Sequence, residues 1–591
     1  MPQALIPVIV KLGVSKLVAT VAAYAITAVA TSFLSSLLTG AQRAESEATE
    51  RDLKLPMPPR LYGMGRRRFY GAQMLFDTAS NGTTGDVWAF LDCPAGRIEA
   101  VETVYLNDDV ATLVGDLVQG QADGRYSGPR LRVGWNLGNP TEAAFSSIVA
   151  LFPGVWSANH RGDRIFSGYL TKDPVLAKDF LKVYPQGDNV TMSLVAKSYR
   201  CFDPREPSHD PADPSTWAWT ENAALHLLWF YMVYRGFDYA TRLEPVIDTW
   251  ITAADICDEA VPLAGGGTEP RYRGCVAWDS TKLPGDVVSE MLACFDGWTG
   301  QDALGRQLVY AGKVYEPTFR VGPEHIISAS RQFGVEDEDR INQLVVQYVS
   351  EAHNWNVVEA SPWRDEAHIS ASGQENSDGF APQTPSFSQN RRLAKRRMKR
   401  QTAPVRGRHS VSIAARDVLA HRYILLEDVE AGATFYSGWA EVIGGERDFD
   451  TGGATFDWIA VDATMDAWNP AIEEGLPAPD GTRVEQGALD APIINAAEPQ
   501  FEADDTMVRA TLDVTGPDRE DLTWFIRWRI EGDASWNEAS YADLDPGTPV
   551  ALITGLLPLS AMVELEVAYQ VGDGRVSPYS ATEEIDTTPE P

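Results

Sequence analysis

The sequence lacks the short patterns on which many hydrolases, metalloenzymes and nucleotide-binding proteins depend. Its 591 residues contain no GxSxG, HExxH or Walker A pattern. The five cysteines are widely spaced without a CxxC pair, and there are only eight histidines. This spacing fits neither a zinc site nor a secreted disulfide scaffold, so we expect reduced and mostly buried thiols. We therefore predict no catalytic, cofactor-binding or metal-binding residues, and no enzymatic turnover.

Basic residues are also scarce. The chain has 50 Lys and Arg against 83 Asp and Glu, which gives a formal net charge of −33. An acidic surface repels phosphates, which argues against a protein built to grip nucleic acid. The excess negative charge either keeps the protein soluble or lines a channel through which DNA slides. The composition leaves both roles open.

The remaining composition is that of a globular, β-rich protein. Hydrophobic residues make up 44% and charged residues 23%, while 48 glycines and 37 prolines indicate many turns. A chain of this length exceeds one hydrophobic core, so we expect several domains in a mixed, α+β architecture. The expected boundaries are 1–45, 46–194, 195–330, 331–480 and 488–591.

The N-terminal forty residues form the longest apolar run. Only Lys11 and Lys16 interrupt it, and residues 17–42 carry no charge. Its length is typical of a membrane span, and the small residues at 39–41 are typical of a signal peptide. The abundant Ala, Ser, Thr and Val also favour close packing between like helices. These three interpretations stay open.

The periodicity of apolar residues and the positions of Gly and Pro predict the main helices, strands and loops along the chain. We expect strands at 101–106, 164–170 and 340–349, and further strands from 401 to about 463. Helices are expected at 221–234, 243–258, 284–295 and 390–400, loops at 203–217 and 371–388, and a linker at 469–487.

The last hundred residues predict a separate β-sandwich. Residues 523–529 and 563–569 alternate as central strands do, and 575–580 is expected to close the unit. With its Leu-x-Pro at 556–558 followed by a strand and a Ser-x-x-Ser, the segment resembles a fibronectin type III module. Met562 stands where that family usually has its corner tyrosine.

One strongly basic segment stands out near residue 395. DNA or anionic lipid is one candidate partner, and an acidic face of a neighbouring subunit or domain is the other. We favour the acidic face, because bases and aromatics are not interleaved as in single-strand binders. We predict that the segment lies at a subunit or inter-domain contact through Arg391, Arg392, Lys395, Arg396, Arg397, Lys399 and Arg400.

Three other groups of residues resemble functional sites, but we expect each of them to be ordinary local structure. His209, Asp210 and Asp213 lie in a Pro-rich segment, where a solvated loop is expected rather than a metal site. The acidic run 336–339 is expected to be a charged turn. Gly265–Gly267 does not follow a strand and lacks the Lys-Ser/Thr of a phosphate loop, so we expect a tight turn with positive φ.

The segment around those glycines carries a more specific pattern. CDEAVP at 257–262, GGGTEPR at 265–271 and Cys275, followed by DVVSEMLACFDG at 286–297, closely resemble a signature of the lambda-type phage tail-tip hub family, also called host specificity or tip attachment proteins. Further similar stretches occur in the same order, at 96–107, 223–230, 339–342 and 390–400. The resemblance covers residues 90–470.

The resemblance implies β-barrel hub domains on either side of a small helical insertion, and a structural role in a virion. It implies a homotrimer that closes the tail tube at the tip of a siphophage tail and takes part in host attachment and genome ejection. Expected partners are the distal tail protein, other tail-tip proteins, the tape-measure protein and a receptor-binding fibre. DNA would only pass through the lumen.

Two features depart from the family. The family has no long apolar N-terminal helix, and this chain stops soon after one fibronectin-like unit, which puts direct receptor binding in doubt. We expect residues 1–40 to pack around the trimer axis, where they would meet the tape-measure protein and, on infection, a host membrane.

Two other function classes stay open. The chain could be a membrane-anchored bacterial surface or adhesion protein, with the N-terminal helix as anchor and the sandwich as binding end. It could also be a tail-associated hydrolase of the cell wall. The GGGTEPR signature favours the hub.

Overall fold

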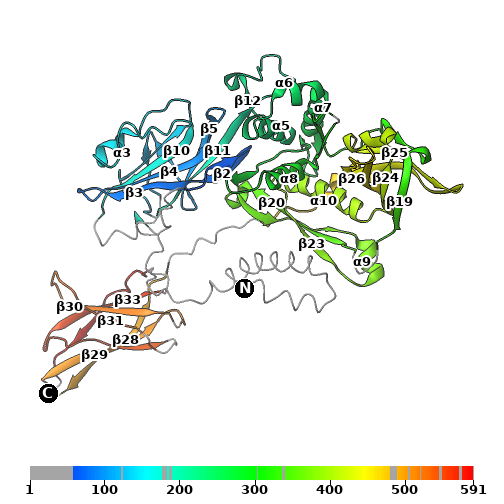
Figure 1. The fold of residues 1–591 in the computed structure, drawn as a ribbon. Helices are drawn as coiled ribbons and strands as arrows, with labels where there is room; N and C mark the ends of the chain where they lie inside the picture. Colours follow the sequence, from blue (N-terminus) through cyan, green and yellow to red (C-terminus); the bar gives the residue numbers. More distant parts are fainter. Residues whose placement is uncertain are drawn as a thin grey trace. The chain divides into compact units, whose positions relative to one another are not determined.

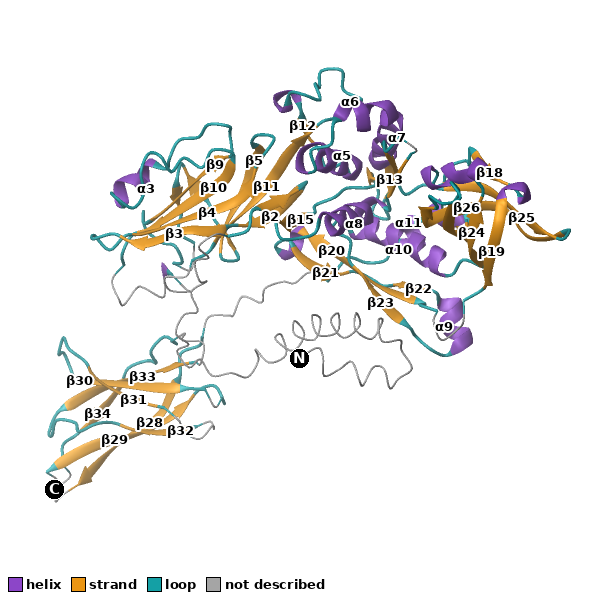
Figure 2. Ribbon diagram, in the orientation of Figure 1, coloured by secondary structure: helices purple, strands orange, loops and turns teal. Residues whose placement is uncertain are grey.

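The computed structural model describes residues 58–589 except 122–123, 176–182, 185–189, 303, 336–339, 480–488, 503–505, 520, 543, 545–548 and 572–575. The described chain divides into two compact units, one within residues 51–481 and one within residues 482–591. Strands dominate both described parts, which confirms the β-rich α+β class (Figures 1 and 2). The expected N-terminal helix lies outside the described residues, and none of the helices within them could span a membrane.

The first part of the large unit is built from two antiparallel sheets (Figure 1). One has the order β3-β4-β10-β9-β8-β7, and the other the order β12-β11-β5-β6 with β2 also paired to β11. The bounds are β2 Arg66–Tyr70, β3 Ala72–Thr78, β4 Thr84–Asp92, β5 Ile98–Leu106, β6 Asp109–Val110, β7 Leu113–Val114, β8 Leu117–Val118, β9 Leu131–Leu137, β10 Ile165–Lys172, β11 Met192–Cys201 and β12 Ala218–Trp219. The strands expected at 101–106 and 164–170 are confirmed by β5 and β10.

A helical layer follows at α5 (Ala223–Trp229), α7 (Ile247–Asp258) and α8 (Pro284–Phe295). All seven residues of α5 are buried, and the Asn222 side chain caps the helix by accepting from the N–H groups of residues 224 and 225. Helix α5 continues as the π-helical turn η4 (Phe230–Tyr234), which confirms the helix expected at 221–234. Strands and helices share one hydrophobic core, in which Phe90, Leu194, Trp229, Trp250 and Phe295 are buried.

His226 of α5 makes this core sensitive to pH. Its Nε2 lies 2.9 Å from the carbonyl oxygen of Thr220, so this nitrogen carries the proton. Burial lowers the pKa of His226 from 6.5 to about 4. The unfolded chain therefore takes up a proton between these pH values that the folded chain does not, and stability is lost as pH falls.

We expect His226→Gln, whose amide can still donate to Thr220, to remove that dependence. The difference in free energy of unfolding between pH 7 and pH 4 should be about 3 kcal/mol smaller in the variant, at 1.36 kcal/mol per pKa unit. Urea denaturation of both proteins at the two pH values measures it. An identical pH dependence in the two proteins would contradict a neutral, buried His226.

The second β region of the large unit contains a six-stranded sheet of order β18-β25-β26-β27-β24-β19 and a smaller one around β20. The bounds are β18 Phe319–Val321, β19 Ile326–Phe333, β20 Gln343–Ser350, β21 Asn356–Glu359, β22 Trp363–Arg364, β23 Ser377–Phe380, β24 Val405–Val411, β25 Tyr423–Glu430, β26 Ala433–Arg447 and β27 Ala454–Ala460. The expected strand at 340–349 is confirmed by β20. The main helix here is α10 (Phe387–Gln401), which lies against β20 (Figure 1).

Two segments expected to be irregular are partly structured. The loop predicted at 371–388 contains β23, which pairs in parallel with β20, and its Phe380 packs against the core beneath. The linker predicted at 469–487 begins with helix α11 (Pro470–Glu473), and Ala478 is buried. Composition was misleading for both segments, because they are held in place by contacts with residues that are distant in the sequence.

The small unit, as described over 489–589, is a sandwich of two antiparallel sheets, β28-β29-β32 and β31-β30-β33-β34. The bounds are β28 Ile493–Glu502, β29 Met507–Thr515, β30 Thr523–Ile530, β31 Asn537–Tyr541, β32 Val550–Ile553, β33 Met562–Gln570 and β34 Glu583–Asp586. The segment expected to close the unit lies along the second half of β33 over residues 576–580. The N–H groups of Ser577 and Ser580 donate to the carbonyl oxygens of Tyr569 and Val567, and their hydroxyls accept from backbone N–H groups of β33, while β34 pairs with the first half of β33.

Candidate functional site around helix α10

Helix α10 carries the basic residues that the sequence singles out, and most of them are buried. Ser386 caps its N-terminus by accepting from the N–H of Gln389. Arg391, Arg392, Lys395 and Arg396 are each less than a tenth exposed. A cationic side chain at this depth needs partners within the protein and is not available to DNA or lipid.

Two carboxylates from distant segments form the centre of the charge cluster. Asp296, the residue that ends α8, accepts from Nε of Arg396 at 2.7 Å and from Nη2 of Arg400 at 2.6 Å. Glu441 of β26 accepts from Nε of Arg400 at 2.7 Å and from Nε of Arg422 at 2.9 Å. Arg422 also reaches Asp296 at 3.1 Å, so α8, α10 and β26 are joined through shared ion pairs.

The arginines keep both carboxylates ionised. Burial by itself raises the pKa of Asp296, but the positive charges of Arg400, Arg396 and Arg422 outweigh it. The pKa of Asp296 therefore lies well below its usual range. Glu441 shows the same balance, with burial opposed by Arg422 and Arg400, and its pKa is lowered. Asp296 also has a left-handed backbone with φ of 48°, which a non-glycine residue adopts where its surroundings hold it.

The GGGTEPR segment meets α10 through its glutamate. It forms the hairpin of β13 (Ala260–Pro262) and β14 (Thr268–Pro270), with Gly266 and Gly267 at φ of 89° and 77° in the turn. The expected tight turn with positive φ is thereby confirmed, but the expectation that the glycines do not follow a strand is wrong, because β13 ends three residues before Gly265. Glu269 is buried and accepts from Nη1 of Arg392 at 2.9 Å, from Oγ of Ser386 at 3.0 Å and from Nη2 of Arg273 at 3.0 Å.

The other cations of α10 have partners in the same unit. Arg391 donates to the carbonyl oxygens of Ser361 and Glu473 at 3.0 Å, and Lys395 pairs with the Glu473 carboxylate. The two outermost residues, Arg397 and Lys399, are more than a third exposed and pair with Asp378 and Asp462. All seven residues therefore have partners within this chain, and contact of α10 with a second subunit stays a prediction.

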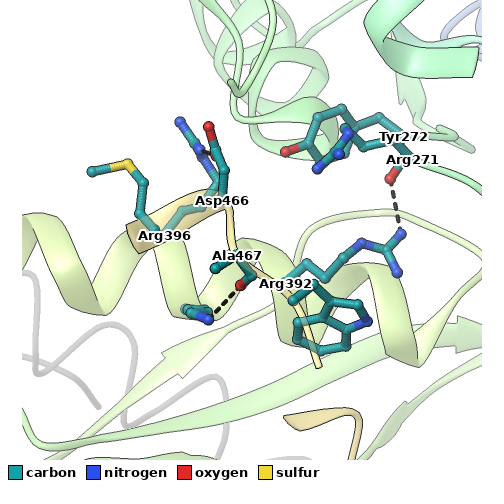
Figure 3. A pocket seen from close by; sticks show the side chains of 9 residues that line it. Arg271, Tyr272, Arg392, Arg396, Asp466 and Ala467 are labelled. Atoms are coloured by element: carbon teal, nitrogen blue, oxygen red, sulfur yellow. Dashed lines mark hydrogen bonds and ion pairs between the residues drawn. The ribbon is translucent and has the colours of Figure 1, made fainter. Parts of the chain in front are cut away.

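A cavity of about 10 Å³ lies beside the cluster, next to Arg271, Tyr272, Arg392, Arg396 and Asp466 (Figure 3). Two hydrogen bonds flank it, from Arg392 to the carbonyl oxygen of Arg271 and from Lys395 to that of Ala467. A cavity of this size accommodates about one water molecule. The contacts around the cavity are therefore contacts between segments of the chain that are distant in sequence.

The other candidate residues named from the sequence make hydrogen bonds with residues close to them in the chain. His209 accepts from the backbone N–H of Asp203 through Nδ1, and Asp213 accepts from the N–H of Ser215. Over the described ranges no three His, Cys, Asp or Glu side chains gather as a metal site. The acidic run 336–339 lies outside the described residues. The five cysteines are buried free thiols, as expected, and burial raises the pKa of each.

The sequence did not reveal the acidic half of the cluster. Asp296 lies between the end of α8 and Gly297, where a glycine alone would account for the helix end. Glu441 does carry a signal, because it is an acidic residue at a position within an alternating strand that turns out to be buried. A buried acid of this kind indicates a cationic partner without identifying it.

No protein-family model and no curated protein sequence matches the chain. Among solved structures, a virion of a native gene transfer agent particle is similar at 13% identity and a TM-score of 0.45, covering 75% of this chain and 97% of that one. The 43 kDa tail protein of prophage MuSo2 from Shewanella oneidensis is similar at 9% identity and a TM-score of 0.23, covering 68% and 97%. A myokine structure is similar at 16% identity and a TM-score of 0.14, covering 17% and 100%. At these scores the likenesses do not decide the function.

Proposed function

We propose that this chain is a structural protein of a phage-like particle, namely the trimeric central hub of a lambda-type tail tip. The observation that carries the proposal is the CDEAVP and GGGTEPR pattern, which resembles the hub signature. In the fold this pattern covers the end of α7 and the β13–β14 hairpin, whose Glu269 is buried and pairs with Arg392 of α10. The signature thus coincides with a structural junction.

The charge cluster supports a structural role. Its ion pairs link α8, the β13–β14 hairpin and β26 to one helix. Buried ion pairs add little net stability compared with apolar packing, but removing one partner is strongly destabilising. Such a cluster favours one arrangement of the helical layer and the second β region, which suits a part that must keep its shape while DNA passes.

In the proposed particle the hub closes the tail tube and binds the distal tail protein, the tape-measure protein and a receptor-binding fibre. The net charge of −33 lets DNA pass through the lumen without adhering. Residues 1–40 are assigned to contact with the tape-measure protein and, on infection, with a host membrane.

The mass of the purified full chain tests the trimer. In detergent-free buffer, light scattering should give three times the chain mass of 64.8 kDa. A monomer that stays in solution only with detergent would contradict the hub and favour the membrane-anchored surface protein.

We also propose that the chain has no enzymatic turnover. Incubation of the purified protein with isolated bacterial cell wall should release no sugar or peptide above a heat-denatured control. Release that disappears on substitution of a single carboxylate would instead establish the tail-associated hydrolase.

A further inference from the structure

A larger cavity, of about 370 Å³, lies where three loops of the first β region meet helix α5. Its walls include the turn Pro94–Arg97 between β4 and β5, residues Asn139 and Pro140 after β9, and Asp213–Ser215, with Trp229 of α5 on another side. The volume lies in the range of sites that bind small ligands or side chains of a peptide. Nothing in the α10 cluster involves this cavity.

Three arginines line the cavity, and two of them have no carboxylate partner in the described part of the chain. Arg200 pairs with Glu99, whereas the guanidinium group of Arg164 donates to the carbonyl oxygen of Pro94, at 3.2 Å. Arg97 makes no ion pair there, and its buried Nε has no hydrogen-bond partner. Arg164 is exposed and Arg97 is half-buried, so the cavity presents two guanidinium groups that have no carboxylate partner in the described residues.

A buried indole completes the site. Trp229 is 1% exposed and stacks on Tyr199, with ring centroids 4.5 Å apart and planes 4° from parallel. Its Nε1–H has no acceptor among the residues that the structure describes. A buried donor without a partner is unfavourable, and an oxygen of a ligand in this cavity would satisfy it.

The backbone of the surrounding loops is held in a strained form. Arg164 has φ of 58°, and its N–H donates to the carbonyl oxygen of Asn139 at 2.8 Å. Its own carbonyl oxygen accepts from the N–H of Cys93, also at 2.8 Å. A left-handed arginine persists only where its surroundings fix it, and such residues gather at ligand sites.

We propose that this cavity binds an acidic peptide segment of a neighbouring protein. Its carboxylates would pair with Arg97 and Arg164, since guanidinium groups bind carboxylates in a two-pronged geometry. An acceptor of the same segment would reach Nε1 of Trp229, and the rings of Pro94 and Pro140 would contact its apolar atoms. Asp213 at the rim and the net charge repel every anion, and they repel a highly charged polyphosphate chain most, so we expect the peptide to carry few carboxylates. The identity of the neighbour as a tail protein rests on the proposed function.

The test uses the full chain, labelled with ¹⁵N in its indole groups. The probe is acetyl-Glu-Leu-Glu-amide, and the neutral control is acetyl-Gln-Leu-Gln-amide. The acidic peptide should shift the Trp229 indole signal, which is assigned by its absence in Trp229→Phe. A fluorescent form of the peptide gives the affinity of each variant without that assignment.

We expect binding to weaken about tenfold in Arg97→Gln and in Arg164→Gln, and to be unchanged in Arg408→Gln, an exposed arginine of β24. No shift, or equal binding of the neutral peptide, would overturn the proposal. Inorganic phosphate binding more tightly than the acidic peptide would also overturn it and indicate a phosphate site. Binding is measured on the isolated chain, so a failure here is separate from a failure of the tail-tip location.

Discussion

Replacing Asp296 by Ala is expected to lower the free energy of unfolding of the large unit by about 3–5 kcal/mol, the usual cost of removing one partner of a buried ion pair. Three arginines would then lose a shared acceptor, and the side chains of two of them, Arg396 and Arg422, are only 2% exposed. Asp296→Asn separates charge from shape, because asparagine tolerates the same left-handed backbone. The Asp296→Asn substitution should therefore also be strongly destabilising.

Glu446→Gln is the matched control for Asp296. Glu446 pairs with Arg408 at 2.8 Å, but both side chains are more than half exposed. Exposed pairs contribute about 0–1 kcal/mol, so this variant should unfold almost as the natural protein does. Urea denaturation followed by tryptophan fluorescence measures all three variants. If the Asp296 variants also unfold like the natural protein, the cluster does not hold the unit together.

The second large effect is expected in the sandwich. Trp524 of β30 is 2% exposed and lies in the core beside Tyr569, with ring centroids 5.5 Å apart. Trp524→Ala should cost about 3–5 kcal/mol, because a large cavity replaces the ring. Since the sandwich has its own core, its unfolding transition should move to lower temperature while that of the large unit stays unchanged.

Trp536 provides the comparison for Trp524 within the same unit. It is only partly buried, and its ring lies 4.5 Å from the guanidinium carbon of Arg527 and 4.3 Å from that of Arg529. Exposed contacts of this type contribute about 0.5–1 kcal/mol each, so Trp536→Ala should have a much smaller effect. Calorimetry of the full chain reads both transitions. A shift of the large unit by Trp524→Ala would contradict two independent cores.

Elements governed by neighbouring residues were predictable from the sequence. Helix α8 spans the expected residues 284–295, because Pro284 opens it and its apolar spacing continues to Phe295. Helix α10 extends the expected 390–400 by three residues at its start, where Ser386 provides the cap. Strand β23 was missed, because a polar segment becomes a strand there only through pairing with β20, more than thirty residues earlier.

Only the basic half of the candidate site was predictable from the sequence. The basic residues of α10 lie together in the sequence and were found by composition alone. Their carboxylates are dispersed: Asp296 lies a hundred residues before Arg396, and Asp466 seventy after it. Arg391 pairs with carbonyl oxygens rather than carboxylates, and side-chain chemistry gives no signal for such partners. The cavity at Arg97 and Arg164 was not foreseen either, because its loops meet only in the fold.

The location of the chain in a particle tests the central claim most directly. Antibodies against the sandwich, bound to tailed particles purified from the organism that encodes the chain, should label one end of each tail, distal to the head. Reconstruction of that tip should then show three copies around the tail axis. Particles that lack the chain, or label confined to the bacterial envelope, would contradict a tail-tip hub.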